Sequence, residues 1–475
     1  MMKKILFLAF AGLASMSACA QKKIYIPEDL RNMDLQADSS KWSFKRSIET
    51  DDLIFMWERG FGSDTSNPPK LDGKPMGFSL QNLRDRVQEF YIFFRDTLGF
   101  VQTTPTPSYS GGEKGGNSYS GGEKGGNSYS GGEKGGNSYS GGEKGGNSYS
   151  GGESRGVSKA DKYKMMVMVM YSNDGTAYGG TYDNFIGALW VAPNRIQDTK
   201  MNCMAHELGH SFQLQIPADS VGDAWGGSGF YEMTSQWMLW QVNPDWIADE
   251  YYHLEAFRNL THKAFLHIEN IYHSPYIIQW WSDLRGRKSI AELYRSGKIG
   301  EDPVMTYKRM YGLSQQEFCD EIFRGYQHLV NFDFKHARKE TRQYACTFDT
   351  ELTTQKDGFL RPKNYPEEYG FNAILLDNRV DIKNARSFSL QINGDQLRYG
   401  FLGITTDDEE IYGDINATSF TVPQGKKLRH LYLIVMGAPT VHYQISMPTE
   451  ENASGTLREF PYSFRVSADT TGSQN

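Results

Sequence analysis

Two histidines and a glutamate with fixed spacing are the residues of this sequence best suited to chemistry. His206, Glu207 and His210 form an H-E-x-x-H motif in a segment that has the period of a helix. The i, i+4 spacing places both imidazoles on one face, where two ring nitrogens can reach one Zn²⁺ at about 2.0 to 2.1 Å. Glu207 can then take a proton from a metal-bound water and deliver it to a leaving nitrogen. The motif therefore predicts a hydrolytic zinc site with Glu207 as general base.

A zinc site of this kind needs a third protein ligand, and three zincin layouts offer candidates. The metzincin layout requires a glycine and a histidine three and six positions after His210, where this chain has glutamine and isoleucine, so it is excluded. An aspartate ligand could come from Asp219 or Asp223, beside a glycine-rich stretch. Glu232 begins the string Glu-Met-Thr-Ser, 22 positions after His210. This E-x-x-S/A arrangement resembles that of the gluzincin metallopeptidases.

Within the gluzincins, the chain resembles the enhancin-like peptidases, some of which attack heavily glycosylated mucin-type proteins. The resemblance rests on H-E-L-G-H-S-F-Q at 206–213 and on the glutamate that follows at Glu232. The chain is also similar to uncharacterised secreted H-E-x-x-H proteins of gut-type bacteria, through 206–213, Y-E-M-T-S-Q-W at 231–237, Y-G-F-N at 369–372 and M-G-A-P at 436–439. The resemblance implies a zinc peptidase whose metal ligands are His206, His210 and Glu232.

The same resemblance implies roles for residues around the metal. Gluzincins often carry an aspartate four residues after the glutamate ligand to orient a histidine; Gln236 stands there in this chain, and its carbonyl can do the same. A tyrosine or histidine from the helical half usually stabilises the oxyanion, and Tyr272, His273 and Tyr276 are the candidates. Segment 185–191 is either the edge strand that pairs with an extended substrate or an ordinary core strand.

The elements that position these residues follow from the spacing of apolar side chains. A serine cap and a closing glycine mark a helix over 79–98, weak alternation suggests strands in 42–60, and 163–171 is apolar on both faces, as in a buried strand. The fold expected is α+β: a zincin-like catalytic domain, with a small mixed sheet and a helical subdomain, followed by a C-terminal antiparallel β-sandwich. Helices are expected near 201, at 231–241, 249–272, 277–284 and 315–329, and strands at 387–392, 399–404, 418–422 and 431–436.

The N-terminus and a repeat set the organisation of the chain. Lys3 and Lys4, an apolar stretch and small residues predict a signal peptide over 1–20, with either a lipid on Cys19 or cleavage after Ala20. A ten-residue unit, S-Y-S-G-G-E-K-G-G-N, begins at 108, 118, 128 and 138, with a decayed copy from 148. This glycine-rich unit buries too little apolar surface to fold, so 103–157 is expected to be a disordered insertion. The expected domains are 24–102 and 158–335 for the catalytic part and 345–470 for the sandwich.

Charge and cysteine content narrow the function classes. The net charge of −7, with scattered lysines and arginines, argues against a nucleic-acid partner. Cys203, Cys319 and Cys346 allow at most one disulfide, Cys319 to Cys346, or three free thiols. The motif, the resemblance and the signal sequence together lead us to expect an exported monomeric zinc peptidase that acts on proteins or glycoproteins, at the cell surface, in the periplasm or secreted. The alternative is a catalytically silent glycan-binding or adhesive surface protein that retains the zincin scaffold.

Overall fold

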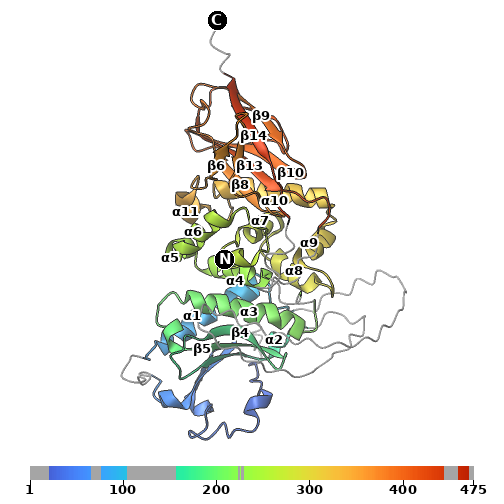
Figure 1. The fold of residues 1–475 in the computed structure, drawn as a ribbon. Helices are drawn as coiled ribbons and strands as arrows, with labels where there is room; N and C mark the ends of the chain where they lie inside the picture. Colours follow the sequence, from blue (N-terminus) through green and yellow to red (C-terminus); the bar gives the residue numbers. More distant parts are fainter. Residues whose placement is uncertain are drawn as a thin grey trace, which may run out of the picture.

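The chain folds as an α+β protein, which confirms the predicted class. Its colours run from the blue and green mixed sheet, through a helical layer, to two red and orange antiparallel sheets (Figure 1). The predicted signal peptide with Cys19, the repeat over 104–156 and Asp223 lie outside the described residues. The structure is a computed structural model that describes residues 21–65, 76–103, 157–222, 225, 229–442 and 458–469.

A five-stranded mixed sheet forms the base of the molecule, in the order β1-β2-β3-β5-β4. Strands β2, β3 and β5 are parallel, and the two edge strands β1 and β4 run antiparallel to their neighbours. All five residues of β3 are buried, as expected from its continuous apolar run. The edge-strand interpretation of 185–191 is wrong, because β5 pairs on both sides and β4 is the edge. The bounds are β1 (Ser47–Glu49), β2 (Leu53–Trp57), β3 (Met165–Val169), β4 (Ala177–Tyr182) and β5 (Ile186–Val191).

Helices α1 and α3 pack together on the mixed sheet, with α3 against β4 and β5 (Figure 1). Ser79 caps α1 by accepting a hydrogen bond from the Asn82 backbone N–H at 3.1 Å, as its sequence predicts. The Phe212 ring of α3 contacts the rings of Tyr91 and Phe94, which anchors the two helices to each other. The bounds are α1 (Leu80–Ile92), continued by a π-helical turn (Phe93–Thr97), α2 (Lys159–Lys162) and α3 (Asn202–Ala218).

The two described segments that flank the repeat are hydrogen-bonded to each other. The Ser158 backbone N–H donates a hydrogen bond to the Gln102 carbonyl oxygen at 2.9 Å. Ser158 and the Lys159 backbone N–H also bind the carboxylate of Asp219, at the end of α3. Hydrogen bonds therefore hold together the two described segments on either side of 104–156.

The helical layer begins with α4, which packs against α3. The helix predicted over 249–272 is wrong beyond Leu260. The carbonyl oxygens of Thr261 and His262 accept hydrogen bonds at 2.7 Å from the Phe371 and Glu367 backbone N–H groups, so bonds to the C-terminal region replace helical ones. The bounds are α4 (Phe230–Val242), α5 (Trp246–Asp249), α6 (Tyr251–Leu260), α7 (Tyr276–Arg285), α8 (Ser289–Ser296), α9 (Pro303–Tyr311), α10 (Gln315–Val330) and α11 (Arg338–Thr341).

Two antiparallel sheets form the C-terminal region, and the four strands predicted there are present. One sheet has the order β11-β10-β13-β8, and the other β12-β9-β14-β7-β6. The turn at Asn393 and Gly394 joins β9 to β10, which belong to different sheets. The bounds are β6 (Leu352–Thr354), β7 (Leu360–Pro362), β8 (Phe371–Leu375), β9 (Ser387–Asn393), β10 (Leu397–Thr405), β11 (Glu410–Tyr412), β12 (Ser419–Thr421), β13 (Leu428–Gly437) and β14 (Ser463–Asp469).

The four-stranded sheet is buried on both faces by two separate cores. In β13, Tyr432 and Ile434 join the large core shared with the helices, whereas Leu431 and Leu433 join a smaller core shared with the five-stranded sheet. This alternation follows from the period of two along a strand. Helix α10 covers the helical side, where the Gln327 side chain donates to the Phe401 carbonyl oxygen at 3.0 Å.

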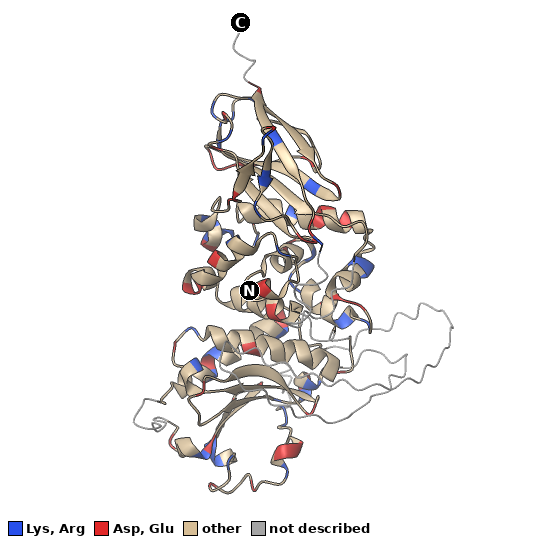
Figure 2. Cartoon of the chain, viewed as in Figure 1, with Lys and Arg blue, Asp and Glu red and all other residues tan. Residues whose placement is uncertain are grey.

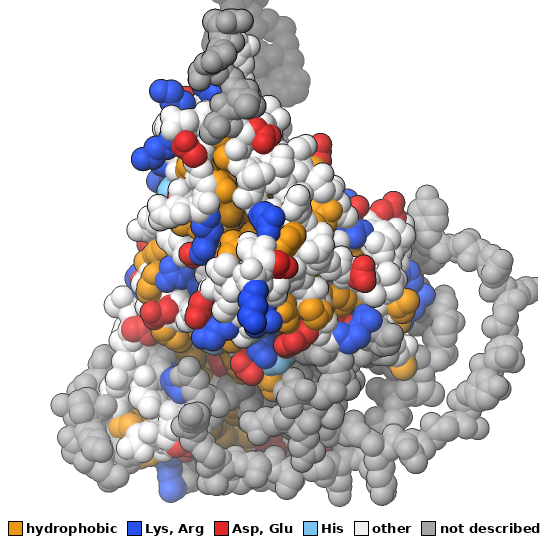
Figure 3. All heavy atoms as spheres, turned by 45° about the horizontal axis from the view of Figure 1, so that its top comes forward, with side chains coloured by type: hydrophobic (Ala, Val, Ile, Leu, Met, Phe, Trp, Pro, Cys, Tyr) orange, Lys and Arg blue, Asp and Glu red, His pale blue; other side chains and the backbone are white. Residues whose placement is uncertain are grey.

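Charges are distributed over the described elements without a field of one sign. Acidic and basic side chains occur along the same helices and strands (Figure 2), and they are interspersed on the face turned forward in Figure 3. None of the helices within the described residues is long and apolar enough to span a membrane.

The described cysteines are three free thiols, so the bridge considered between Cys319 and Cys346 is not formed. Cys319 is buried on α10, with Sγ 3.8 Å from the Pro439 carbonyl oxygen. Cys346 instead contacts Asn331 through Sγ at 3.3 Å from Oδ1. The two thiols have different surroundings, which explains why they do not pair.

Candidate metal centre

The two motif histidines converge with Glu232 at the contact between α3 and α4. His206 and His210 project from α3, and Glu232 lies in the first turn of α4. The His206 Nε2 atom, the His210 Nε2 atom and the Glu232 Oε2 atom lie 3.1 Å from one another in each pair. Their side chains are 11 to 13% exposed, so the group lies just below the surface. Three potential ligand atoms from two helices thus form one compact triangle.

A glycine inside the motif allows the two helices to approach. A Cβ atom on Gly209 would lie 2.9 Å from Ser235 Oγ and 3.3 Å from Ser235 Cα. A side chain here would force Ser235 and the helix backbone to shift, so glycine favours this helix separation. The approach brings the first turn of α4 within reach of both histidines. Gly209 therefore contributes to the site without offering a ligand.

Gln213 fixes the orientation of the His210 ring. The Gln213 Nε2 atom donates to the Tyr231 carbonyl oxygen at 3.0 Å, and a carbonyl oxygen can only accept. This contact assigns the amide orientation and leaves Gln213 Oε1 facing His210 Nδ1 at 3.1 Å. Ser235 Oγ lies at the same distance from that nitrogen. His210 therefore carries a proton on Nδ1, and its Nε2 atom points into the triangle.

Gln236 has the equivalent role at His206. Its Nε2 atom donates to the Tyr272 carbonyl oxygen at 3.0 Å, which fixes the amide orientation. Its Oε1 atom then faces His206 Nδ1 at 3.1 Å. His206 therefore also carries its proton on Nδ1 and directs Nε2 toward Glu232. The carbonyl role expected of Gln236 from the sequence is the one that the geometry allows.

Glu207 lies beside this group but points to the mixed sheet. Its Oε2 atom accepts a hydrogen bond from the Gly179 backbone N–H of β4 at 2.8 Å. Burial raises the pKa of the Glu207 carboxyl above its ordinary value, although the neighbouring His206 and His210 oppose the rise. The carboxyl is therefore better able to hold a proton than an ordinary surface glutamate.

Opposite charges inside the triangle shift the pKa values of its members. Burial by itself lowers the pKa of His210, but the Glu232 carboxylate outweighs this effect and raises that pKa to about 9. Burial by itself raises the pKa of Glu232, but the two imidazoles hold it far below its usual range. Without a cation between them, these groups form a buried ion pair.

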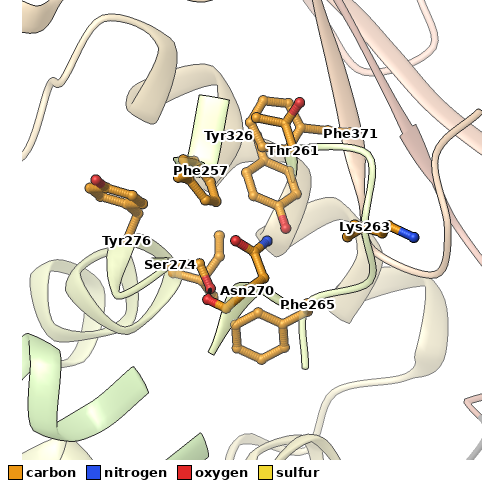
Figure 4. A pocket seen from close by; sticks show the side chains of 10 residues that line it. Phe257, Thr261, Lys263, Phe265, Asn270, Ser274, Tyr276, Tyr326 and Phe371 are labelled. Atoms are coloured by element: carbon orange, nitrogen blue, oxygen red, sulfur yellow. Dashed lines mark hydrogen bonds between the residues drawn. The ribbon is translucent and has the colours of Figure 1, made fainter. Parts of the chain in front are cut away.

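The three oxyanion candidates occupy different places. The Tyr272 ring lies beside the His206 ring, with centroids 6.2 Å apart. His273 contacts His253 instead, with the two Nδ1 atoms 2.6 Å apart, and burial, as the largest cause, lowers the pKa of His273 to about 4. Tyr276 is buried among the rings of Trp240, Phe257 and Phe332 and lines a small cavity, shown in Figure 4. A substrate cannot reach its hydroxyl there, so Tyr276 is rejected as an oxyanion donor.

The aspartate alternative for the third ligand fails at Asp219. That carboxylate ends α3, nine residues beyond His210 or about 13 Å along the axis, where it accepts from Lys159 N at 2.9 Å and Gln215 Nε2 at 2.8 Å. Sequence reasoning also missed residues that the structure places around the site. Gln213 has a recognisable signal, because it lies three positions after His210 on the same helix. Gly179 has none, because only the packing of β4 on α3 brings it to Glu207.

Comparison with known proteins identifies a family but no characterised relative. A family model described as "Family of unknown function (DUF6055)" matches residues 16–111 and 153–472. The break between the two matched segments falls within the ten-residue repeat. No curated protein and no solved structure matches the chain.

Proposed function

The chain belongs to the DUF6055 family of unknown function, and we propose that it is an exported zinc metallopeptidase. It hydrolyses peptide bonds of proteins or glycoproteins, with Glu207 as general base. The observation that carries the proposal is the triangle of His206, His210 and Glu232. We propose that these three side chains hold one Zn²⁺ ion, because two imidazole nitrogens and a carboxylate oxygen gathered this closely are the ligand set of a single cation.

The donor set fits Zn²⁺ by chemistry and by spacing. Two imidazoles and one glutamate are the protein ligands of several catalytic zinc sites, which keep a fourth position open. Ligand atoms bound tetrahedrally at about 2.0 to 2.1 Å lie about 3.3 Å apart. The three atoms here are 3.1 Å apart. When bound, zinc lowers the pKa of a coordinated water to about 7 and polarises the scissile carbonyl.

Glu207 supplies the proton transfer in this proposal. Its carboxylate accepts the proton of the attacking water and then passes that proton to the leaving nitrogen of the peptide. Its raised pKa suits both steps, because a general base works best when its pKa approaches the working pH. The Gly179 N–H holds the carboxylate at β4 and leaves its other oxygen for the water. Tyr272 and His273 stay our candidates for a donor to the oxyanion.

The edge strand β4 offers a place for an extended substrate. It ends the mixed sheet, and its residue Gly179 contacts the proposed base. An extended peptide that adds to this edge by backbone hydrogen bonds therefore passes Glu207. The role that the sequence suggested for 185–191 thus moves by one strand, from β5 to β4.

The domain assignment and the location belong to the same proposal. We infer a zincin-like catalytic domain made of 24–102 and 158–335, interrupted by the insertion at 103–157, and a β-sandwich over 345–470. The shared core between the two C-terminal sheets supports the sandwich. Export rests on the sequence of 1–20, and a lipid on Cys19 would attach the chain to a membrane.

Metal content and substrate hydrolysis test the proposal together. Protein purified without chelator should contain one zinc per chain and cleave casein or mucin, and a chelator should remove both zinc and cleavage. The alternative is a catalytically silent glycan-binding or adhesive protein, which would be retained on a sugar column without cleaving either substrate. A chain that binds no zinc at any pH between about 7 and 9 would overturn the proposal, since zinc sites of this type are populated there.

A further inference from the structure

We propose that His253 is a positioning residue for the metal centre, held by His273 and acting through Gln236. It keeps the Gln236 amide in the orientation that fixes His206 as an Nε2 ligand. The inference rests on the proposed function and extends it beyond the residues that touch the metal. His253 belongs to no recognisable motif and lies on a different helix, α6.

The two hydrogens on Gln236 Nε2 have different acceptors. One Nε2 hydrogen is donated to the Tyr272 carbonyl oxygen. The other faces His253 Nε2 at 3.2 Å. Because an amide nitrogen carries hydrogens and accepts none, His253 Nε2 must be the acceptor and must lack a proton. Gln236 thus has both hydrogens and its carbonyl oxygen in use, and the residue is only 4% exposed.

The remaining ring nitrogen of His253, Nδ1, carries the proton. A neutral imidazole without a proton on Nε2 carries it on Nδ1. His253 Nδ1 lies 2.6 Å from His273 Nδ1, so His253 donates and His273 accepts. His273 is suited to accept, because burial, the largest cause, lowers its pKa below the ordinary histidine value and keeps it neutral. The hydrogen bonds then run in one direction, from His206 through Gln236 and His253 to His273.

The surroundings hold His253 in this place. Its side chain is 6% exposed, and its ring packs against the rings of Trp246 and Tyr252. Glu250 Oε2 lies 3.4 Å from His253 Nε2, but that carboxylate is already bound by Asn202 Nδ2 and Trp246 Nε1, each at 2.8 Å. Glu250 therefore has two donors closer than His253, whereas the Gln236 hydrogen has His253 as its acceptor.

The orientation of the Gln236 side-chain amide decides which nitrogen of His206 is free to bind the metal. If its Nε2 hydrogen lost the His253 acceptor, a buried donor would be left unpaired, which costs about 1 to 3 kcal/mol in this setting. An amide that rotates to avoid this cost turns a hydrogen-bond donor toward His206 Nδ1. His206 would then carry its proton on Nε2, where it blocks the metal. His253 therefore secures the ligand-competent form of His206.

A set of variants separates this role from simple packing. We expect His253→Phe, which keeps a ring but removes the acceptor, to weaken zinc binding about 3- to 10-fold, less than the 10- to 100-fold of a direct partner of a ligand. His253→Gln restores an acceptor at similar reach and should return the affinity to within about 2-fold of wild type. His328→Phe is the matched control, because His328 is also a part-buried ring stacked on aromatic residues, namely Trp280 and Tyr412.

A double-mutant cycle identifies the route. Gln236→Leu should weaken zinc binding about 10- to 100-fold, and adding His253→Phe to it should cost less than about 2-fold more, since the two residues act as one unit. Chelator competition measures each affinity, and kcat and KM are followed in parallel, with the loss expected in kcat. Independent, additive losses, or wild-type affinity in a folded His253→Phe chain, would overturn the inference.

A second measurement does not depend on zinc. In metal-free protein at about pH 8, above the ordinary histidine pKa of about 6.5, long-range ¹H–¹⁵N spectra of histidine-labelled chain report which nitrogen is protonated. We expect His253 to carry its proton on Nδ1, and a proton on Nε2 overturns the inference. If His253 has the expected form in a chain that binds no zinc, the proposed function fails while the hydrogen-bond chain stands.

Discussion

Gly179 donates its backbone N–H to the Glu207 carboxylate at 2.8 Å, and this contact joins the edge strand β4 to the motif helix α3. The same glycine lies so close to α3 that a Cβ atom on it would be 1.8 Å from the Glu207 carbonyl oxygen. The strand can approach the helix only because this position has no side chain. The placement of the proposed base thus depends on a residue far from the motif.

The first prediction concerns this approach. Gly179→Ala should push β4 away from α3, lower the free energy of unfolding by about 1 to 3 kcal/mol and reduce hydrolysis through loss of the hydrogen bond to Glu207. Gly180→Ala is the control, since a Cβ there meets Trp190 at an ordinary 3.6 Å. Denaturant titrations and rate assays of both variants are the measurement. Equal behaviour of the two variants would contradict the role given to Gly179.

The second prediction concerns the proposed base. Glu207→Gln keeps an oxygen that accepts the Gly179 N–H and removes no ligand, so zinc content should stay at that of the wild type. Hydrolysis should fall by about 10²- to 10⁴-fold, because the side chain can no longer take up a proton. Metal analysis and kcat on the same sample check both halves. Full activity in this variant would rule out Glu207 as the base.

The third prediction is a pH dependence that arises from His210. Its folded pKa of about 9 lies above the ordinary 6.5, so in metal-free protein its ion pair with Glu232 stabilises the fold fully below pH 6.5. That contribution is lost as the pH rises through 9. Zinc must displace the same proton, so zinc affinity should rise by up to about tenfold per pH unit toward pH 9.

Two measurements check this dependence. Urea unfolding in chelator at about pH 6.5, 8 and 9.5 should show falling stability, and chelator competition should show rising zinc affinity over the same interval. Glu232→Gln removes the negative charge that raises the His210 pKa. The free energy of unfolding of the metal-free variant should therefore not fall between about pH 6.5 and 9.5. A wild-type stability that is flat from pH 6.5 to 9.5 would refute the ion pair.

The fourth prediction concerns the repeat. Because Ser158 N and the Gln102 carbonyl oxygen are hydrogen-bonded at 2.9 Å, replacing 104–156 by a short Gly-Ser linker should leave the fold and the zinc content unchanged. The free energy of unfolding should rise by up to about 2 kcal/mol, since closing a shorter loop costs less entropy. Denaturant titration and metal analysis test this. Loss of zinc on deletion would show that the insertion contributes to the site.

The secondary structure and the ligand residues could be predicted from the sequence where residue spacing alone determines them. The H-E-x-x-H spacing gave the helix and the approximate position of two ring nitrogens, because 3.6 residues per turn fix both. The continuous apolar run at β3 gave a doubly covered strand for the same kind of reason. Glu232 followed from its resemblance to a known layout, and its meeting with His206 and His210 required the structure.

The remaining features depend on tertiary contacts that leave no local trace. The helix expected through 249–272 ends at Leu260, because backbone groups from the C-terminal region bind Thr261 and His262. The edge of the mixed sheet is β4 instead of β5, since sheet order is set by pairing that the sequence does not encode locally. Tyr276 and His253 show the same limit, one lying in the core and the other contacting Gln236.

The sheet that is buried on both faces restricts how the C-terminal region can meet other molecules. Strands β8, β10 and β13 contribute side chains to two hydrophobic cores, one on each face of the sheet, so neither face is available to bind another molecule. Among the described residues of this region, the outward face of the five-stranded sheet is exposed, because β9 and β14 alternate there between partly buried and solvent-facing positions. Removal of the chain from β8 onward would expose the helical residues that pack on this sheet, so the C-terminal region is part of the main core.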